Sequence, residues 1–215
     1  MLVGKRMTAH PVTVAPNETL AVARAKMQAG HFRRVPVVQN EKLVGILTDR
    51  DIRQHLGHEE RTKVTAAMTE ELVTVTPATT LEYAAQLMLK RQIGGLPVVE
   101  DGKLVGIITT SDIVTAFLDV MGASEEGVAR VDLILKEAPH DLGDAAKAIS
   151  GVGSEILGVG TYREKWDESR AFYVLIRTKD VDYVASVLKA QGFSVLGISL
   201  RCVAHRRASR SGYRR

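Results

Sequence analysis

The sequence predicts a mixed α/β (α+β) protein with two copies of one small unit, followed by a third unit of a different kind. The main observation is an internal repeat, because residues 3–56 recur without a gap as residues 64–117. Of the 46 positions from 7 to 52, 21 are identical to their counterparts 61 residues later. The second observation is that this pattern ends near Gly127, where strands and helices begin to alternate in a new order. A repeat of this length marks a duplicated structural unit.

Each repeat is expected to fold as β-α-β-β-α. Leu20, Ala23 and Met27 recur at helical spacing, and short runs of branched residues flank polar turns, as in β-hairpins. In the first repeat we expect a strand start at 12–14, a helix at 19–29, hairpin strands at 35–38 and 43–47, and a helix at 49–55. In the second repeat the same elements fall at 73–75, 80–90, 96–99 with 104–108, and 110–121. Two such units are expected to pack together through their sheets.

A Thr-x-x-Asp sequence stands where each hairpin passes into the following helix, at Thr48 and Asp51 and again at Thr109 and Asp112. One interpretation is that these side chains only cap their helices, as Ser/Thr-x-x-acid sequences often do. The other is that they contact a ligand, because a helix N-terminus favours anions and an ionised Asp can accept hydrogen bonds from both hydroxyls of a ribose. The matching sequence around both copies favours the ligand.

Three motifs occur twice, in order and in register: Val-Thr-Val-x-Pro, Val/Leu-Pro-Val-Val, and Gly-Ile-x-Thr-x-x-Asp. With these motifs the tandem resembles a CBS domain pair, a module that binds adenine nucleotides and related ligands between its repeats. The resemblance covers slightly more than half of the chain and implies two sites, each taking its ribose-binding Asp from one repeat and other contacts from the second. One site would combine Ile46, Thr48 and Asp51 with Val73, Gly94 and Gly95. The other would combine Ile107, Thr109, Ser111 and Asp112 with Val12, Arg33 and Arg34, and with Arg50 as a further candidate.

The two copies differ just before the Val/Leu-Pro motif, where the first has Arg33-Arg34 and the second has Gly94-Gly95. Arginine presents paired donors to phosphate, whereas glycine offers only backbone amides and space. The arginine-lined site is therefore expected to be the better site for a polyphosphate. The alternative is that the two arginines are solvated residues at the start of a strand.

The third unit is expected to have the element order β-α-β-β-α-β, which is ferredoxin-like. The pattern predicts strands at 128–135, 156–162, 172–176 and 193–200, with helices at 142–149 and 181–191. Its turn after the first strand, the Gly-x-Gly before the second and the Gly-Phe before the last make it similar to an ACT domain. That family often senses amino acids or joins subunits. The turn that would meet an effector consists of Pro139, His140, Asp141 and Leu142.

The family usually has glycine where this chain has His140, so the turn leaves two roles open: an amino-acid site, or a purely structural and dimerising domain. A CBS pair with an ACT domain is the arrangement of the acetoin-utilisation type of CBS protein, and the whole chain is similar to that family.

Composition and motifs argue against several classes of protein. The net charge is +4, but residues 201–215 contribute six arginines and no acidic residue, so residues 1–200 carry a net charge of −2. Only the tail is therefore basic enough to suggest nucleic-acid binding. One cysteine, Cys202, rules out an internal disulfide framework, and no apolar run is long enough for a membrane span or a signal peptide. His55 and His58 lack a second ligand cluster, so no metal is expected. No nucleophile or phosphate loop stands in a catalytic arrangement, and an enzyme is not expected.

We therefore expect repeats at 1–61 and 62–122, an ACT-like domain at 123–200 and a basic flexible tail at 201–215. The expected function is a cytoplasmic regulator, at least a homodimer, that binds an adenosine compound such as AMP, ADP, ATP, S-adenosylmethionine or NAD and relays its occupancy through the ACT-like domain. No catalytic cofactor is expected, and no motif identifies the protein it regulates. The alternative is a nucleic-acid-associated regulator in which the tail binds phosphates and the CBS pair is structural.

Overall fold

The computed structural model describes residues 1–121, 127–134, 142–163 and 170–200. The chain forms two compact units, Met1–Ala116 and Phe117–Arg215. Pro139, His140 and Asp141 of the expected effector turn and the whole basic tail lie outside the described residues. No helix within the described ranges is long and apolar enough to cross a membrane.

The helices of the first unit begin where the sequence provides caps. The Thr19 hydroxyl accepts a hydrogen bond from Val22 N, and the Thr80 hydroxyl accepts one from Tyr83 N, which satisfies amide groups that a helix start leaves unpaired. The α-helices are α1 (Leu20–Ala29), α2 (Asp49–Arg53), α3 (Leu81–Arg91) and α4 (Thr110–Val120), and the short 3-10 helices are η1 (Val3–Lys5) and η2 (Val64–Ala66). The predicted helices are thus present with shifts of one or two residues at their ends.

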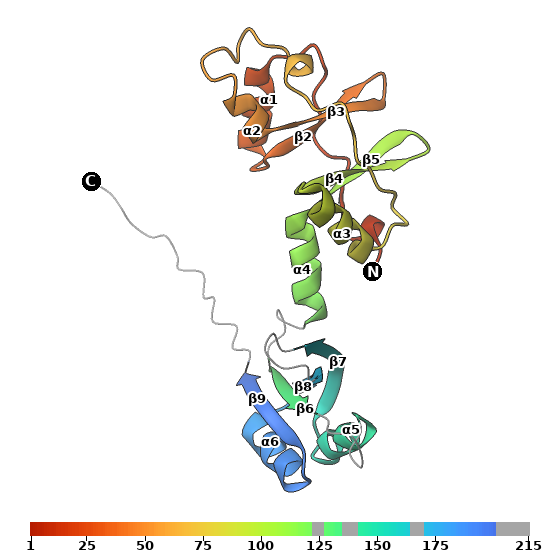
Figure 1. Ribbon diagram of the computed structural model, residues 1–215, viewed down its shortest axis with the longest axis vertical. Coiled ribbons are helices and arrows are strands. Elements are labelled where there is room, and N and C mark those ends of the chain that lie inside the picture. Colours follow the sequence, from red (N-terminus) through yellow and green to blue (C-terminus); the bar gives the residue numbers. More distant parts are fainter. Residues whose placement is uncertain (122–126, 135–141, 164–169, 201–215) are drawn as a thin grey trace, which may run out of the picture. The chain divides into compact units, whose positions relative to one another are not determined.

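Both predicted hairpins are present and are near copies of each other (Figure 1). The strands are β2 (Arg34–Gln39) with β3 (Lys42–Thr48), and β4 (Gly95–Glu100) with β5 (Lys103–Thr109). Each hairpin has a register shift at the same place, between Val37 and Val38 and between Val98 and Val99. The expected strands at 12–14 and 73–75 shrink to single parallel bridges, from Val14 to Val37 and from Val75 to Val98. Pro16 and Pro77 stand two residues after the bridged valines. They limit further strand pairing, because proline lacks the amide proton that the next hydrogen bond would need.

The first residues of each sequence copy pack into the hydrophobic core of the other copy. Val3 of η1 is fully buried among residues of the second repeat, and Val3 N donates to Thr79 O at 2.8 Å. Val64 of η2 is fully buried in the core of the first repeat, and Val64 N donates to Glu18 O at 2.9 Å. Strand β1 (Thr8–Ala9) continues the exchange by pairing with β5. The two repeats are therefore interlocked rather than only stacked.

The second unit has the predicted order β-α-β-β-α-β, with its sheet in the order β7-β8-β6-β9 and all neighbours antiparallel. Its elements are β6 (Val128–Ile134), α5 (Leu142–Gly151), β7 (Glu155–Arg163), β8 (Arg170–Arg177), α6 (Val181–Ala190) and β9 (Ser194–Leu200). The buried residues of α5 and α6 share one core with one face of the sheet. On the other face, Arg130 pairs with Asp132 and lies over the rings of Tyr162 and Tyr173. The relation to ACT domains remains a prediction.

Candidate ligand-binding clefts

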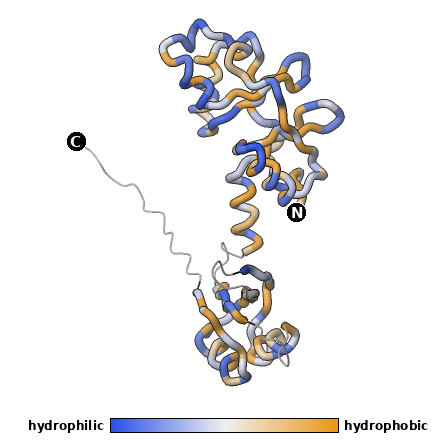
Figure 2. Tube along the Cα trace, viewed as in Figure 1, coloured by the Kyte–Doolittle hydropathy of each residue, from blue (hydrophilic) through white to orange (hydrophobic). Residues whose placement is uncertain are grey.

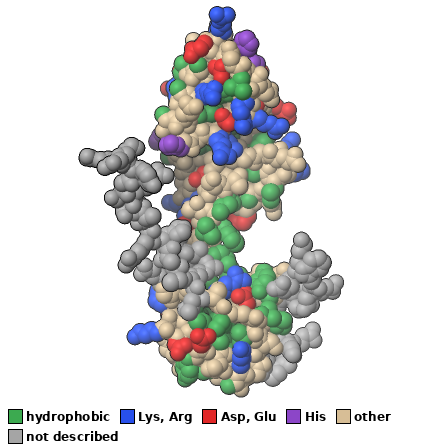
Figure 3. Space-filling view, turned by 90° about the vertical axis from the view of Figure 1, so that its left-hand side faces the viewer, with side chains coloured by type: hydrophobic (Ala, Val, Ile, Leu, Met, Phe, Trp, Pro, Cys, Tyr) green, Lys and Arg blue, Asp and Glu red, His purple; other side chains and the backbone are tan. Residues whose placement is uncertain are grey.

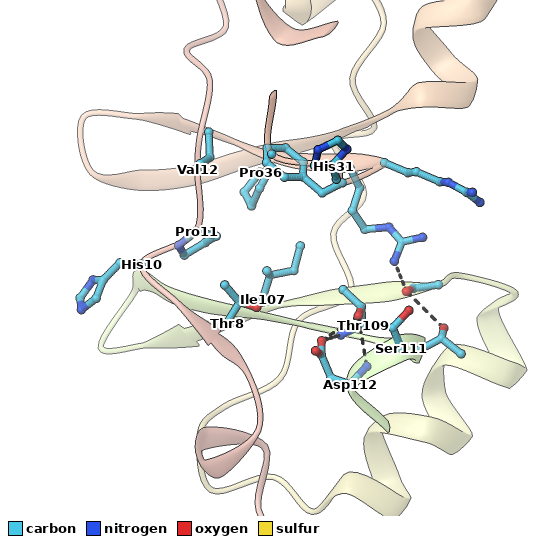
Figure 4. A pocket seen from close by; sticks show the side chains of 16 residues that line it. Thr8, His10, Pro11, Val12, His31, Pro36, Ile107, Thr109, Ser111 and Asp112 are labelled. Atoms are coloured by element: carbon cyan, nitrogen blue, oxygen red, sulfur yellow. Dashed lines mark hydrogen bonds between the residues drawn. The ribbon is translucent and has the colours of Figure 1, made fainter. Parts of the chain in front are cut away.

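Two cavities lie between the repeats of the first unit. The larger, of about 710 Å³, contains Asp112, and the smaller, of about 390 Å³, contains Asp51. We call them the Asp112 cavity and the Asp51 cavity. Figure 4 shows the Asp112 cavity, with Pro36 and His31 on the side of the first hairpin and Ile107, Thr109 and Asp112 on the side of the second.

The cavities are copies of each other, related by the same 61-residue offset as the sequence. Ile107, Thr109 and Asp112 line one as Ile46, Thr48 and Asp51 line the other. The opposite walls also correspond: the Asp112 cavity has Thr8, Val12 and Pro36, and the Asp51 cavity has Thr69, Val73 and Pro97. Each cavity therefore combines a strand-to-helix turn from one repeat with a wall from the other, which is the arrangement expected from the sequence.

The Thr-x-x-Asp turns cap their helices in both repeats. Asp112 Oδ2 accepts hydrogen bonds from Thr109 N and Thr109 Oγ1, both at 2.7 Å, and Thr109 Oγ1 accepts one from Asp112 N at 3.4 Å. Asp51 and Thr48 make the same three bonds at 2.8, 2.7 and 3.4 Å. Within the described residues no hydrogen bond uses Oδ1 of either Asp. Capping and ligand contact are therefore compatible, since capping occupies one carboxylate oxygen and leaves the other available.

The structure brings nearly all candidate residues to the expected cavity. The six residues proposed for the Asp51 site all line the Asp51 cavity: Ile46, Thr48, Asp51, Val73, Gly94 and Gly95. Seven of the eight proposed for the other site line the Asp112 cavity: Val12, Arg33, Arg34, Ile107, Thr109, Ser111 and Asp112. Arg50 is the exception, because it lines the Asp51 cavity. It precedes Asp51 in the chain just as Ser111 precedes Asp112, so each belongs to the cavity of its own Asp.

Arginines line both cavities, which differs from the single arginine-lined site that the sequence suggests. Arg33 and Arg34 face each cavity, and Arg50 and Arg53 add to the Asp51 cavity. Arg53 is paired with Asp49 at 3.3 Å. Figure 3 shows Lys and Arg side chains gathered on one face of the first unit, with acidic side chains among them.

Arg34 reaches across the boundary between the repeats. Its Nη1 donates a hydrogen bond to the carbonyl oxygen of Gly94. A Cβ atom on Gly94 would lie 2.5 Å from Arg34 Nη2, and one on Gly95 would lie 2.6 Å from Arg34 Nη1. The two glycines therefore leave the space that the arginine of the other repeat fills, and a side chain at either position would require Arg34 to move. Burial lowers the pKa of the Arg34 guanidinium, and the positive charge of Arg33 lowers it further.

Some lining residues were missed from the sequence. His10 and His31 line the Asp112 cavity, and the equivalent Glu71 and Gln92 line the Asp51 cavity. His31 and Gln92 share a left-handed backbone, with φ of 54° at both. All four lie two residues before a candidate wall residue (Val12, Arg33, Val73 or Gly94), so the neighbours of those candidates were the signal that could have found them. No group of three His, Cys, Asp or Glu side chains within the described residues is arranged to hold a metal ion.

Known proteins are similar to this chain over its duplicated part. The family model of the CBS domain matches residues 3–58 and 64–119. The CBS domain-containing protein YhcV of Bacillus subtilis is 40% identical over 110 residues, which are 50% of this chain and 79% of that protein. Inosine-5'-monophosphate dehydrogenase of Staphylococcus aureus is 40% identical over 108 residues, which are 48% of this chain but only 22% of the enzyme. The likeness to that enzyme is thus confined to about a fifth of its length.

Three solved structures are similar to the same part of the chain. A protein named as an acetoin utilization protein (AcuB) from Vibrio cholerae has a TM-score of 0.53 and 36% identity, and the match covers 58% of this chain and 95% of that one. The CBS domain pair of protein MJ0100, in complex with 5'-methylthioadenosine and S-adenosyl-L-methionine, has a TM-score of 0.52 and 29% identity, covering 58% and 98%. CBSX2 in complex with AMP has a TM-score of 0.50 and 30% identity, covering 56% and 98%.

Proposed function

Because the chain belongs to the CBS domain family, we propose that it is a regulatory protein that binds an adenosine-containing ligand between its two repeats. The observation that carries this proposal is the geometry of the two Thr-x-x-Asp turns. Each turn lines a cavity between the repeats, and each Asp keeps one carboxylate oxygen outside its capping bonds.

A ribose fits the chemistry of these turns. Its two neighbouring hydroxyls are donors, and an ionised carboxylate is a strong acceptor whose hydrogen bonds contribute about 1.5 to 3 kcal/mol each. The threonine bonds hold the carboxylate of Asp112 in one orientation, so little freedom is lost when a ligand binds. The same holds for Asp51. We therefore propose these two residues as the ribose acceptors of two sites.

The remaining walls suit the other parts of an adenosine ligand. Val12, Pro36 and Ile107 give the Asp112 cavity an apolar surface for a base, and Arg33 and Arg34 give it donors for phosphate. Cavity volumes of about 710 and 390 Å³ fall within the range of roughly 300 to 1,000 Å³ that is typical of small-molecule sites. The structures of the MJ0100 pair and of CBSX2 support this ligand class, since their ligands all contain adenosine.

We further propose that helix α4 carries the signal of an occupied site. Asp112 lies in the first turn of α4, and the residues of this helix from Phe117 onward belong to the second compact unit. A ligand on Asp112 thus touches the beginning of a helix whose other end is part of the next unit. In this proposal the second unit acts as an ACT-like relay, and the regulated protein would respond to it.

We also propose that the protein is at least a dimer. Val114, Phe117 and Val120 of α4 are 50, 59 and 60% exposed, and Figure 2 shows this helix as largely hydrophobic. Such surface is often covered by a partner chain. Sedimentation equilibrium at tens of micromolar protein tests the proposal, because a 23.4 kDa species in the presence of ligand would contradict it.

A thermal-shift screen tests the ligand class. The panel consists of AMP, ADP, ATP, S-adenosylmethionine, NAD and cyclic dinucleotides, with guanosine nucleotides as the control for the base. A ligand at 100 times its Kd stabilises the folded state by about 2.7 kcal/mol. We expect at least one adenosine compound to raise the melting temperature and to lose this effect in Asp51→Ala/Asp112→Ala. The proposal fails if no adenosine compound binds.

A further inference from the structure

The two cavities share part of their wall. Arg33, Arg34 and Gly94 line both the Asp112 cavity and the Asp51 cavity. The other charged or polar groups that face each cavity belong to that cavity alone, including the two Asp carboxylates. A ligand in either cavity therefore meets its own Asp but the same pair of guanidinium groups.

The shared wall is held in place. Arg34 donates to the Gly94 carbonyl across the repeats, and its guanidinium packs where the side chains of residues 94 and 95 would otherwise stand. This arginine is half-buried, and its bond to Gly94 holds the guanidinium between the two cavities. Arg33 is the exposed member of the pair. One guanidinium that is hydrogen-bonded across the repeats and one that is exposed thus stand between the two cavities.

The two arginines of this wall, Arg33 and Arg34, are not paired with acidic side chains in the part of the chain that the structure describes. Of the carboxylates that line the two cavities, Asp51 and Asp112 cap their helices and Asp49 pairs with Arg53, and within the described residues Glu71 forms no ion pair with either arginine. The lowered pKa of Arg34 has burial as its first cause and the charge of Arg33 as its second. Two adjacent like charges without a counterion make a favourable place for one anionic group.

We propose that Arg33 and Arg34 form a single anion site that serves both cavities, so that a polyphosphate bound in one cavity opposes polyphosphate binding in the other. The inference rests on the proposed function, because it assumes that both cavities accept adenosine ligands. An uncharged ligand such as adenosine fills both cavities independently. The shared wall therefore favours simultaneous binding of one ligand that carries a polyphosphate and one that does not, each in its own cavity.

The physical basis is the number of donors and the range of the charge. A guanidinium that holds one phosphate through paired hydrogen bonds has few donors left for a second phosphate on its other side. The second ligand also meets a wall whose charge is already neutralised. In addition it is repelled by the first phosphate group, because the screening length in dilute salt of about 10 Å or more exceeds the thickness of one side chain.

Isothermal titration calorimetry at low salt tests this inference with ATP and adenosine as the probes. Asp51→Ala and Asp112→Ala each leave one cavity with its ribose acceptor, and their affinities define what two independent sites would show. In the unmodified protein we expect the second ATP to bind about tenfold more weakly than these variants predict, within the roughly 5- to 150-fold range of typical coupling between sites. Adenosine should show no such deficit.

Two further measurements keep the test decisive if a single-cavity variant is unstable. In the unmodified protein, the ratio of the two ATP affinities should approach the ratio for adenosine at 1 M salt, where the screening length is about 3 Å. Arg33→Gly, which copies the residue of the second repeat, should also reduce the ATP deficit. ATP affinities that equal those of independent sites, or an equal deficit for adenosine, would overturn the inference alone. If neither probe binds, the proposed function itself is wrong.

Discussion

In the first repeat, Arg34 extends across to the other repeat and donates to a backbone carbonyl; in the second repeat, the equivalent residue is Gly95, which receives the arginine against its backbone. The two hairpins around these residues have the same length, register and bulge. Equivalent residues near the axis that relates two repeats come close to each other, so they cannot both be large. The comparison teaches that a large residue near the axis, such as Arg34, requires a small equivalent in the other copy, so the symmetry is broken there although it is kept elsewhere.

The largest expected effect comes from restoring the symmetry at this place. In Gly95→Arg, a second guanidinium would compete with Arg34 for one space, because even a Cβ atom would lie 2.6 Å from Arg34 Nη1 and 3.2 Å from the Ile108 carbonyl oxygen. Overpacking costs about 1 to 3 kcal/mol, and the repulsion of two half-buried like charges adds to it. We expect a loss of about 3 kcal/mol or more in the free energy of unfolding, measured by urea denaturation.

The matched control exchanges the two residues. Arg34→Gly combined with Gly95→Arg keeps one arginine and one glycine at the axis, so it should recover most of the stability that Gly95→Arg alone loses. A double variant that is less stable than Gly95→Arg would mean that Arg34 has a partner specific to the first repeat and that the symmetry argument is wrong.

The next largest effect sharpens the comparison of the two cavities. Asp112→Ala should weaken binding of an adenosine ligand in the Asp112 cavity by about 1.5 to 3 kcal/mol, the range for hydrogen bonds to a charged group. Asp51→Ala should do the same only for the Asp51 cavity. Because both residues also cap helices, each variant should lose about 0.5 to 2 kcal/mol of stability as well. Calorimetry and denaturation separate the two losses, and unchanged affinity in the double variant would remove the ribose assignment.

A smaller effect tests the exchange of N-terminal segments between the repeats. Val3→Ala and Val64→Ala each remove two buried carbon atoms, with an expected cost of about 2 kcal/mol. Hydrogen exchange should show the greater loss of protection in the hairpin β4–β5 for Val3→Ala and in the hairpin β2–β3 for Val64→Ala. The opposite pattern, with each variant affecting its own sequence copy, would contradict the interlocked cores.

The smallest effect concerns the turn before the first helix of each repeat. The Glu18 carboxylate accepts a hydrogen bond from Ala15 N at 2.6 Å, whereas at the equivalent place the Thr79 hydroxyl accepts one from Thr76 N at 3.0 Å. Burial raises the pKa of Glu18, but the bonds from Ala15 N and Lys26 outweigh it, so the pKa is lowered. The resulting stabilisation is complete above the unfolded pKa of about 4.3 and is lost as the pH falls through the folded pKa.

Glu18→Thr copies the turn of the second repeat and removes this titration. The unmodified protein should therefore lose stability relative to the variant as the pH falls below about 4.3, by no more than about 1 kcal/mol because the pair is partly exposed. Thermal unfolding of both proteins between pH 3 and 7 checks the difference, and parallel curves would show that the Glu18 bonds do not matter.

Local signals were sufficient for most elements of both units. Thr19 and Thr80 start their helices in the predicted places, and the β-α-β-β-α-β order of the second unit is as expected. These element predictions succeeded because caps, turns and hydrophobic spacing depend on neighbours only a few residues away. The resemblance to CBS pairs supplied the candidate site residues; all but Arg50 line the expected cavity, and their roles in binding stay predictions. The strands expected at 12–14 and 73–75 became single bridges, because Pro16 and Pro77 lack the amide proton that a longer ladder would need.

The sequence by itself determined that this chain is a duplicated unit with two equivalent Thr-x-x-Asp turns, followed by a different unit. Only the tertiary structure decided that Val3 and Val64 exchange cores and that Arg34 stands between both cavities. The physical reason is that these features depend on residues far apart in the chain, such as Val3 with Thr79, Val64 with Glu18, and Arg34 with Gly94. A repeat shows that two residues are equivalent, but whether they meet depends on where the axis between the copies lies.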